Sequence, residues 1–345
     1  MSVTIGVCRL GALTIVAAAL ALHAAPLAAQ SVEQFYKSNN MTITIGHPPG
    51  GSYDLYARLA ADHLGQYIPG KPNIILQHRP GGGGVKAVIW FYEQAPRDGS
   101  NMALFPETIG HTQILQPEIG KWKLEEMSYI GGFVPSTSAY MVRKGAPAMT
   151  AAAMRTTPVK VGCTGRTAQS FQYPASLNAL GGFKFELVCG YPGSADVILA
   201  LTRGEVDVYS ASWHAWRSTH KQEIANGTFT PIIQGGLVRS ADLPNVPLMQ
   251  DLVDDPKTKK ILEFISAGSA IGRALIVPPQ VPADRLAALR AAFDKLVADP
   301  AFQQLAAKRG ADLEPTPGSE VQKFADSIAK APKEIVEAAK KAIEG

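Results

Sequence analysis

Short β-branched runs alternate with glycine-rich turns and amphipathic stretches along this chain, and this alternation most narrowly limits the fold. A β-branched run at 42–45 is broken by Gly50-Gly51-Ser52. Apolar residues then recur at roughly helical spacing, at Leu55, Leu59, Ala60, Leu64 and Ile68. Ser52 or Asp54 is placed to cap that helix. Further strand-like runs at 74–77 and 102–105 flank a turn of four glycines, Gly81–Gly84.

The same alternation starts again in the second half of the chain. Strands are predicted at 140–143, 159–162, 185–188, 206–209 and 231–234, with helices after 165 and 193. The C-terminal part reads as helices over 283–298, 300–308 and 319–343. Alternating strands and helices indicate parallel βαβ units, so two such sets predict two α/β lobes. Ligands of such sheets bind beyond the carboxyl ends of the strands, which directs attention to the loops 46–54, 78–84, 105–111, 162–170 and 190–195.

The N-terminus has the pattern of a secretory signal peptide. Arg9 is the only charge before an almost wholly apolar run from Leu10 to Leu22, and small residues follow Pro26. This run is short for a membrane span, so we expect cleavage near Ala29 and an exported, periplasmic chain. An uncleaved anchor is the alternative. Removal of residues 1–29 also removes Cys8 and leaves Cys163 and Cys189.

The composition argues against several classes of protein. Of the 345 residues, 46% are hydrophobic, which is enough for a buried core and excludes a mainly disordered chain. The net charge is +4 and the basic residues are scattered, whereas a nucleic-acid-binding protein usually has a basic face. We therefore expect no nucleic-acid partner.

The motifs of common catalytic and cofactor sites are missing from the sequence. The histidines show no HxH or HExxH spacing, so no metal site is expected. Ser52 stands where a phosphate-binding loop starting at Gly46 would need lysine, and Pro80 weakens a dinucleotide-binding reading of the four glycines. No GxSxG elbow occurs, although a Ser–His–Asp set assembled from distant positions stays open. We expect no cofactor and no enzymatic activity, and a secreted hydrolase is the alternative.

Two loops suit ligand binding better than catalysis. Residues 50–54 and 164–170 each combine small residues with a predicted helix start, where unpaired N–H groups carry partial positive charge. Two such helix starts facing each other across a cleft can hold a carboxylate. Each loop taken alone is better explained as a tight, capped strand-to-helix turn, and it is the pair of matching loops in two lobes that favours binding.

These motifs together resemble the receptors of tripartite tricarboxylate transporters, the Bug-type solute-binding proteins. The similarity spans roughly Thr42 to Phe324. It is carried by the segments 45–54 with Ala57-Arg58, 77–84, 96–99 before 102–105, 243–247, 277–285 and Asp299-Pro300. Their order along the chain, more than any one of them, makes the resemblance specific.

The resemblance implies a two-lobed α/β fold of the type II periplasmic-binding-protein kind, with the ligand cleft between the lobes. Lobe 1 would comprise 30–138 plus 266–345 and lobe 2 would comprise 139–265, hinged at two crossovers. The function implied is capture of a small carboxylate and its delivery to membrane permease subunits. A ligand-sensing subunit of a signalling system is a further alternative, and we expect a monomer.

The family's ligand loops carry over to named positions here. The expected ligand-binding residues are His47, Gly50, Gly51, Ser52, Tyr53, Asp54, Phe105, Thr108, Thr164, Arg166, Ala168, Gln169, Ser170, Trp213 and Arg273. His47, Ala168 and Gln169 depart from the family's usual aromatic and hydroxyl residues, which puts the usual dicarboxylate or tricarboxylate ligand in doubt.

Individual residues in that set have specific expected roles. Asp54 is expected to shape its loop by accepting backbone N–H bonds rather than to touch the ligand. Arg166 or Arg273 would pair with the carboxylate, or else be a solvated or lobe-linking arginine. Phe105 and Trp213 would line an apolar wall, although ordinary packing explains Trp213 equally well.

The resemblance also places Cys163 and Cys189 near the carboxyl ends of successive strands in lobe 2. An exported protein with two remaining cysteines favours a disulfide between them. Two buried thiols are the alternative.

Overall fold

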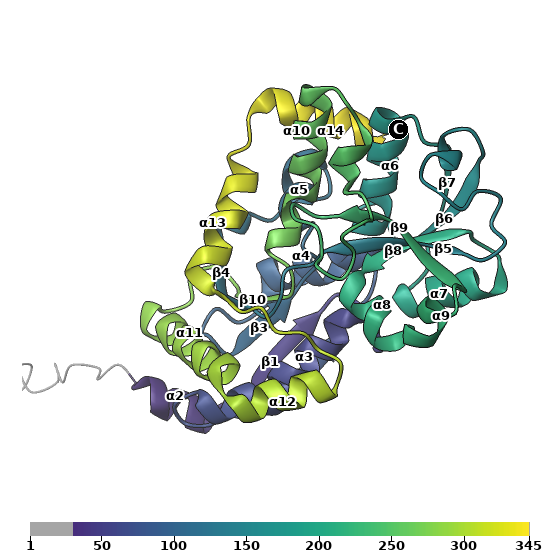
Figure 1. Ribbon diagram of the computed structural model, residues 1–345. Coiled ribbons are helices and arrows are strands. Elements are labelled where there is room, and N and C mark those ends of the chain that lie inside the picture. Colours follow the sequence, from purple (N-terminus) through teal and green to yellow (C-terminus); the bar gives the residue numbers. More distant parts are fainter. Residues whose placement is uncertain (1–29, 345) are drawn as a thin grey trace, which may run out of the picture.

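The computed structural model describes residues 30–344, and the predicted signal peptide lies outside this part of the chain. Two separate mixed sheets form the framework, each with helices packed around it (Figure 1). The predicted two-lobed α/β fold is thereby confirmed. Among the described residues, none of the helices has the length and apolar character needed to span a membrane.

The first sheet has the strand order β11-β4-β10-β3-β1-β2. Strand β1 pairs in parallel with β2 and β3, whereas β10 is antiparallel to both β3 and β4. The bounds are β1 Met41–Ile45, β2 Ile74–His78, β3 Asn101–Leu104, β4 Ser128–Gly132, β10 Ala274–Val277 and β11 Thr316–Pro317.

The second sheet has the order β7-β6-β8-β5-β9. Strand β6 is parallel to β7 and β8, and β5 is antiparallel to β8 and β9. The bounds are β5 Ser138–Arg143, β6 Val159–Cys163, β7 Phe185–Cys189, β8 Val208–Ser212 and β9 Phe229–Gly235. The expectation of purely parallel units therefore fails for β5 and β10, and the two-residue strand β11 is also antiparallel to its neighbour β4. Both β5 and β10 follow a segment that passes from the other sheet, so each enters its new sheet in the opposite direction.

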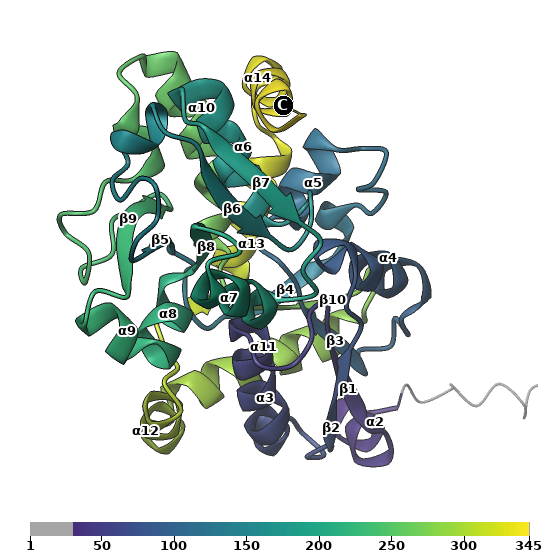
Figure 2. The same cartoon turned by 90° about the vertical axis from the view of Figure 1, so that its right-hand side faces the viewer.

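Helices cover both sheets and connect them (Figure 2). Their bounds are α2 Val32–Ser38, α3 Ser52–His63, α4 Val85–Gln94, α5 Ile109–Leu115, α6 Gln169–Gly181, α7 Ser194–Arg203, α8 Trp213–Thr219, α9 Lys221–Ala225, α10 Pro256–Ser266, α11 Ala283–Ala298, α12 Pro300–Lys308, α13 Gly318–Ala329 and α14 Lys333–Glu344. Short 3-10 helices occur at Leu64–Tyr67, Gly82–Gly84, Leu124–Glu126, Ala153–Arg155, Met249–Leu252 and Ala267–Ala270.

The last helix predicted from the sequence, 319–343, is in fact two helices. Helix α13 ends at Ala329 and α14 begins at Lys333, directly after Pro332. A proline disfavours helical backbone at the preceding residue and lacks the N–H that a continuous helix would use. The break lets α14 turn onto the second sheet's side, where it packs against α6 and α10 (Figure 1).

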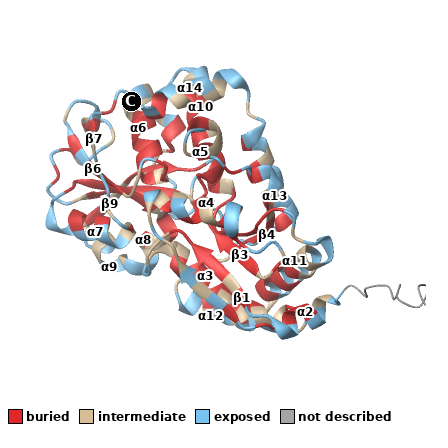
Figure 3. Ribbon diagram, turned by 180° about the vertical axis from the view of Figure 1, so that it is seen from behind, coloured by how far each residue is buried: buried red, intermediate tan, exposed pale blue. Residues whose placement is uncertain are grey.

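Each sheet has its own apolar core, seen as buried strands in Figure 3. Ile43, Leu104 and Phe293 belong to one cluster around the first sheet, and Val161 and Leu177 belong to a cluster around the second. The predicted division at 138/139 and 265/266 stays a prediction, and so does the assignment of everything after 266 to lobe 1. The packing of α14 against α6 leads us to propose that this helix moves with lobe 2.

A disulfide joins Cys163 and Cys189 at the ends of neighbouring parallel strands. These two residues are direct register partners on β6 and β7, with their Cα atoms 4.4 Å apart. That distance lies within the range a disulfide spans. The link ties the start of the 164–170 loop to the turn that precedes α7.

Candidate functional site

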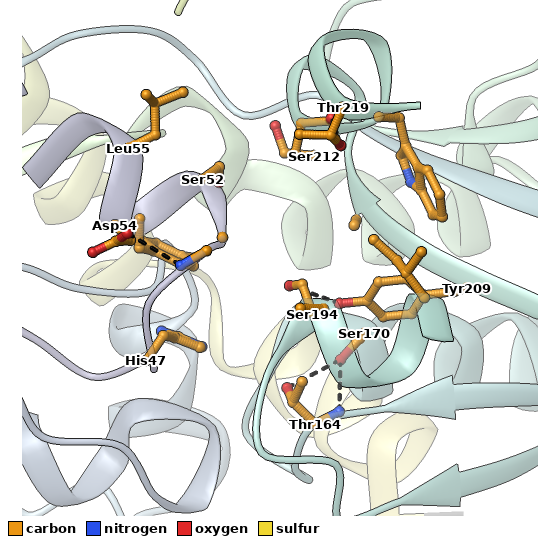
Figure 4. Close-up of a pocket in the computed structure, with 18 of the residues that line it drawn as sticks. His47, Ser52, Asp54, Leu55, Thr164, Ser170, Ser194, Tyr209, Ser212 and Thr219 are labelled. Atoms are coloured by element: carbon orange, nitrogen blue, oxygen red, sulfur yellow. Dashed lines mark hydrogen bonds between the residues drawn. The ribbon is translucent and has the colours of Figure 1, made fainter. Parts of the chain in front are cut away.

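A cavity of about 610 Å³ lies between the two sheets and is lined from both lobes. The first lobe contributes the loop before α3 and the first turns of that helix. The second lobe contributes the starts of α6 and α7, the end of β8 and one side of α8. Figure 4 shows His47, Ser52 and Asp54 on one side, facing Thr164, Ser170 and Tyr209 on the other.

Asp54 holds the first-lobe loop in shape. Its Oδ2 accepts the backbone N–H of Gly50 at 3.1 Å and Arg58 Nε at 2.9 Å, while its Oδ1 lies 2.7 Å from His78 Nε2. Gly50 has φ +96°, a left-handed conformation that glycine adopts without strain. Burial alone would raise the pKa of Asp54, but the bonds from Arg58, His78 and Gly50 outweigh it and lower that pKa. The carboxylate is thus occupied with the loop.

Three helices begin at the cavity without a side-chain cap. Their N-cap residues are Gly51 for α3, Ala168 for α6 and Gly193 for α7, and none of these makes a side-chain capping bond in the described chain. The first-turn N–H groups of a helix have no partner within the helix. Their partial positive charge suits an anion. The cavity therefore offers backbone donors from both lobes.

A buried ion pair forms the floor of the cavity on the first-lobe side. Arg273 donates from one NH group to Glu107 Oε2 at 2.9 Å and from Nε to Ser52 Oγ at 2.9 Å. Tyr53 donates its hydroxyl to the same Oε2 at 2.5 Å, and Ser136 donates to Oε1 at 3.2 Å. Arg273 and Glu107 are each 4% exposed. Glu107 thereby connects the loop before α5, the start of α3 and both crossover segments.

His47 is a neutral part of the cavity wall. Its ring stacks on Tyr53 with centroids 4.5 Å apart and an interplanar angle of 8°. Burial, reinforced by the positive charge of Arg273, lowers the pKa of His47 to about 4. The imidazole therefore carries no charge at neutral pH. The pKa of Tyr53 is raised, mainly by burial and further by the adjacent Glu107. The Tyr53 hydroxyl therefore stays protonated and can donate a hydrogen bond.

Hydroxyl groups on the second-lobe side are held by their neighbours. Ser170 Oγ accepts the backbone N–H of Thr164 at 3.2 Å. Tyr209 donates its hydroxyl to Ser194 Oγ at 2.9 Å, and the amide of Gln169 donates to Ser210 Oγ at 2.7 Å. Between these groups the wall is apolar, formed by Ala195, Ile198, Leu199, Ala211, Ala215 and Trp216.

Contacts between the lobes flank the cavity on two sides. Thr167 donates its hydroxyl to the carbonyl of Gly82 at 2.8 Å, and its own carbonyl accepts the hydroxyl of Thr108 at 2.9 Å. Elsewhere Asp312, between α12 and β11, binds His214 at 2.7 Å and also binds Arg217, both on α8. The glycines at 81–84 thus contact the other lobe and do not line the cavity.

Most of the residues expected from the sequence meet at this cavity. Its lining includes His47, Gly50, Gly51, Ser52, Tyr53, Asp54, Thr164, Ala168, Gln169, Ser170 and Arg273. Their direct contact with a ligand stays a prediction.

Four expected residues lie outside the lining. Phe105 is buried in the first-lobe core, with its ring 5.1 Å from that of Phe91. Thr108 makes the interlobe bond described above. Arg166 is exposed with its guanidinium 4.8 Å over the Phe171 ring, and Trp213 packs in the second-lobe core while donating to Asp242 at 3.0 Å. These side chains belong to packing, to the surface and to lobe contacts.

Several lining residues have little or no signal in the amino-acid sequence. Glu107 stands in a loop already singled out, but a lone glutamate has no motif, and its partner Arg273 is 166 positions away. Tyr209 and Ser210 lie at the end of a predicted strand, and Ser194 opens a predicted helix. Because ligands of such sheets bind beyond the strand ends, the sequence predicts which segments lie near the ligand. It does not predict which of their side chains face it.

The described part of the chain offers no metal centre. Between residues 30 and 344, no group of three or more histidine, cysteine, aspartate or glutamate side chains is arranged to hold a metal ion. The chemistry available at the cavity is hydrogen bonding, helix-start electrostatics and apolar contact.

Comparison with known proteins finds one family model that matches most of the chain. The model describes the tripartite tricarboxylate transporter family receptor and matches residues 56–340. A curated relative from Cupriavidus necator, described as a UPF0065 protein in the gbd 5' region, is 26% identical over 244 residues, covering 69% of this chain and 72% of the relative.

Solved structures with the same fold are also found. The periplasmic binding protein BugD has a TM-score of 0.69 at 18% identity, covering 88% of this chain and 97% of its own. MatC from Rhodopseudomonas palustris with bound malate has a TM-score of 0.68 at 17% identity and coverages of 88% and 98%. An R. palustris protein solved with adipate has a TM-score of 0.68 at 16% identity, covering 87% of this chain and 97% of its own. At these identities the likeness concerns the fold alone.

Proposed function

Because the chain belongs to the receptors of the tripartite tricarboxylate transporter family, as the match over residues 56–340 shows, we propose that it captures a small carboxylate between its lobes. The family and fold are those of solute-binding proteins, as the resemblance predicted. Two proteins of this fold were solved with malate and with adipate, both carboxylates. The single observation that carries the proposal is the cavity between the sheets, where uncapped helix starts from both lobes converge.

Capture follows from what the two lobes supply. A carboxylate oxygen accepts N–H groups from the first turn of α3, and the other oxygen accepts from the first turn of α6. Each helix start is positioned by its own lobe, so binding both at once favours the closed arrangement. The hydroxyls of Ser52 and Thr164 lie beside these donors and complete the contact. The segments 133–137 and 266–273, which connect the lobes, would act as the hinge.

The cellular role proposed here is reception for a transporter. We propose that residues 1–29 are removed near Ala29, that the mature chain acts in the periplasm as a monomer, and that it delivers its ligand to the membrane permease subunits of a tripartite transporter. This is supported by the family and by the apolar run at 10–22 of the sequence.

The ligand is proposed to leave chemically unchanged. The hydroxyls of Ser52, Ser194 and Ser210 accept bonds from Arg273, Tyr209 and Gln169 respectively, so each engages a group other than the histidine of a hydrolytic triad. This arrangement favours binding over the hydrolase alternative.

A thermal-shift screen of mono-, di-, tri- and aromatic carboxylates tests the proposal. A ligand at 100 times its Kd stabilises the folded protein by about 2.7 kcal/mol, which raises the melting temperature by several degrees. Ala195→Trp fills the cavity from α7 and should abolish the shift, whereas Ala287→Trp, at an exposed alanine of α11 outside the cavity, should retain it.

Two outcomes contradict the proposal. One is no shift with any carboxylate. The other is consumption of the ligand during incubation, detected by NMR of the recovered solution, since a receptor returns its ligand intact.

A further inference from the structure

We propose that this cavity selects a monocarboxylate with an apolar body, such as a medium-chain or aromatic acid, over acids that carry a second carboxylate at the far end. The inference rests on the proposed function and narrows its ligand class. It is carried by two features of the lining: every arginine is already paired with a carboxylate, and the wall opposite the first-lobe loop contains an apolar surface on α7, β8 and α8.

The cationic side chains of the lining are neutralised from within the protein. The lining of the described cavity contains three arginines, and each lies within 4 Å of a carboxylate oxygen. The pairs are Arg58–Asp54 at 2.9 Å, Arg273–Glu107 at 2.9 Å and Arg309–Asp62 at 3.0 Å. Arg166, the other arginine expected to meet a carboxylate, lies outside the lining. The cavity therefore has no uncommitted cation for a second ligand carboxylate.

The pair at the floor is the one that matters most for selectivity. Arg273 and Glu107 are almost fully buried, so solvent screens their mutual attraction very little. Because Glu107 offsets its charge, Arg273 adds little net attraction for a ligand carboxylate. A second carboxylate that found no backbone donors would therefore lose its hydration without compensation.

One carboxylate can still be held by backbone groups. The uncapped starts of α3, α6 and α7 all lie at the cavity, where Ser52 on one side faces Ser170 and Ser194 on the other (Figure 4). Backbone donors of this kind carry partial charges and suit one anionic group.

Part of the opposite wall offers apolar surface that can contact hydrocarbon. On α7 the residues Ala195, Ile198, Leu199 and Thr202 face the cavity at helical spacing, while Val197 and Leu201 pack into the second-lobe core. Trp216, Ala211 and Ala215 extend this wall along β8 and α8. Leu199 is 48% exposed, which leaves apolar surface for a ligand to cover. The volume of about 610 Å³ is in the range of pockets that hold ligands much larger than a four-carbon diacid.

Matched ligand pairs test the proposal on the unaltered protein. Isothermal titration calorimetry compares hexanoate with adipate, and 4-methylbenzoate with terephthalate, because each pair differs only by a methyl group replaced by a carboxylate. We expect the monocarboxylate of at least one pair to bind at least tenfold more tightly than its partner. Equal or tighter binding of the diacids overturns this inference and leaves the proposed function standing. Failure of all four acids, and of every acid in the wider screen, overturns both.

A pair of leucine variants tests the apolar wall. Leu199→Ser should weaken the better monocarboxylate about fivefold, since it removes apolar surface that the ligand covers. Leu237→Ser is the matched control, because Leu237 is 43% exposed in the loop after β9 and does not line the cavity. Unchanged affinity in Leu199→Ser, or equal losses in both variants, contradicts the apolar contact.

Glu107→Gln tests the neutralised cation. The glutamine keeps the shape and an acceptor oxygen but removes the charge, so Arg273 becomes available to the ligand carboxylate held beside Ser52. In this variant hexanoate and adipate should both bind at least fivefold more tightly than to the unaltered protein. Unchanged affinity for both acids, in a variant that melts cooperatively, refutes the role of the pair. The leucine variants and ligand pairs keep the proposal testable if the variant does not fold.

Discussion

Replacement of Asp54 by alanine is the perturbation that most sharply tests how the first-lobe loop is built. The change removes one backbone bond from Gly50, one bond to His78 and one to Arg58. Loss of a backbone cap costs about 1 kcal/mol, and loss of a buried charge-assisted bond costs roughly 1.5–3 kcal/mol. The bond to Arg58 adds at most about 1 kcal/mol, because half of the arginine side chain is exposed. We expect a total loss of about 3 kcal/mol in the free energy of unfolding.

Urea denaturation followed by tryptophan fluorescence measures that loss as a lower midpoint. Asp62→Ala is the control on the same helix: its carboxylate is half-exposed and forms an ion pair with the half-exposed Arg309, so its removal should cost less than about 1 kcal/mol. Calorimetry of the same variants follows the loop, and Asp54→Ala should weaken carboxylate binding at least tenfold, since nothing then fixes Gly50 in its left-handed conformation. A midpoint and an affinity both unchanged in Asp54→Ala would refute this account of the loop.

Three further predictions concern acid, reduction and lobe contact. Burial lowers the pKa of His47 and of His111 to about 4, so between pH 6.5 and 4 the unfolded chain binds protons that the folded chain does not. The free energy of unfolding should therefore fall as the pH falls through this window, by up to about 1.4 kcal/mol per pH unit for each histidine. Urea denaturation of His47→Phe should show a shallower dependence on pH. The Cys163–Cys189 bridge closes a loop of 26 residues, worth about 3.5 kcal/mol on the chain-entropy model, so dithiothreitol should lower the melting temperature and an Ellman assay on denatured, unreduced protein should find no free thiol from these two residues. Gly83 has φ +67°, and a Cβ added there would lie 2.8 Å from the Thr167 hydroxyl of the facing loop. Gly83→Ala should therefore disturb this contact between the lobes and weaken ligand binding severalfold in calorimetry. Full affinity would show that binding does not need the contact.

The strands and the lobes were accessible from the sequence because their signals are local. β-branched runs and helical spacing within ten or fifteen residues predicted β1, β2, β3, α3 and most of the second sheet. The direction of β5 and β10 was not accessible, because it depends on how the chain enters a sheet after crossing between lobes. Pro332 marks the helix break, but the helical spacing of apolar residues continues on both sides of it and so predicts a single helix.

The parts of the candidate site formed by backbone loops are predictable from the sequence. The parts that depend on pairing between side chains far apart in the sequence are much less so. Gly50, Gly51 and Ser170 belong to strand-to-helix loops that the sequence marks directly, and they line the cavity. The sequence predicts Arg273 as one of two candidate ligand arginines but does not predict its partner, because Glu107 meets it only through the fold. No property of either residue alone indicates that their charges cancel.

The position of a bound carboxylate tests the central claim most directly. A crystal structure of the protein with the acid that gives the largest thermal shift should show that acid in the cavity between the lobes. We predict its carboxylate within hydrogen-bond distance of the first-turn N–H groups of α3 and of α6 or α7, with Arg273 still paired to Glu107 and the ligand's body against Leu199. A ligand bound outside this cavity, or one whose carboxylate displaces Glu107 to pair with Arg273, would contradict the account.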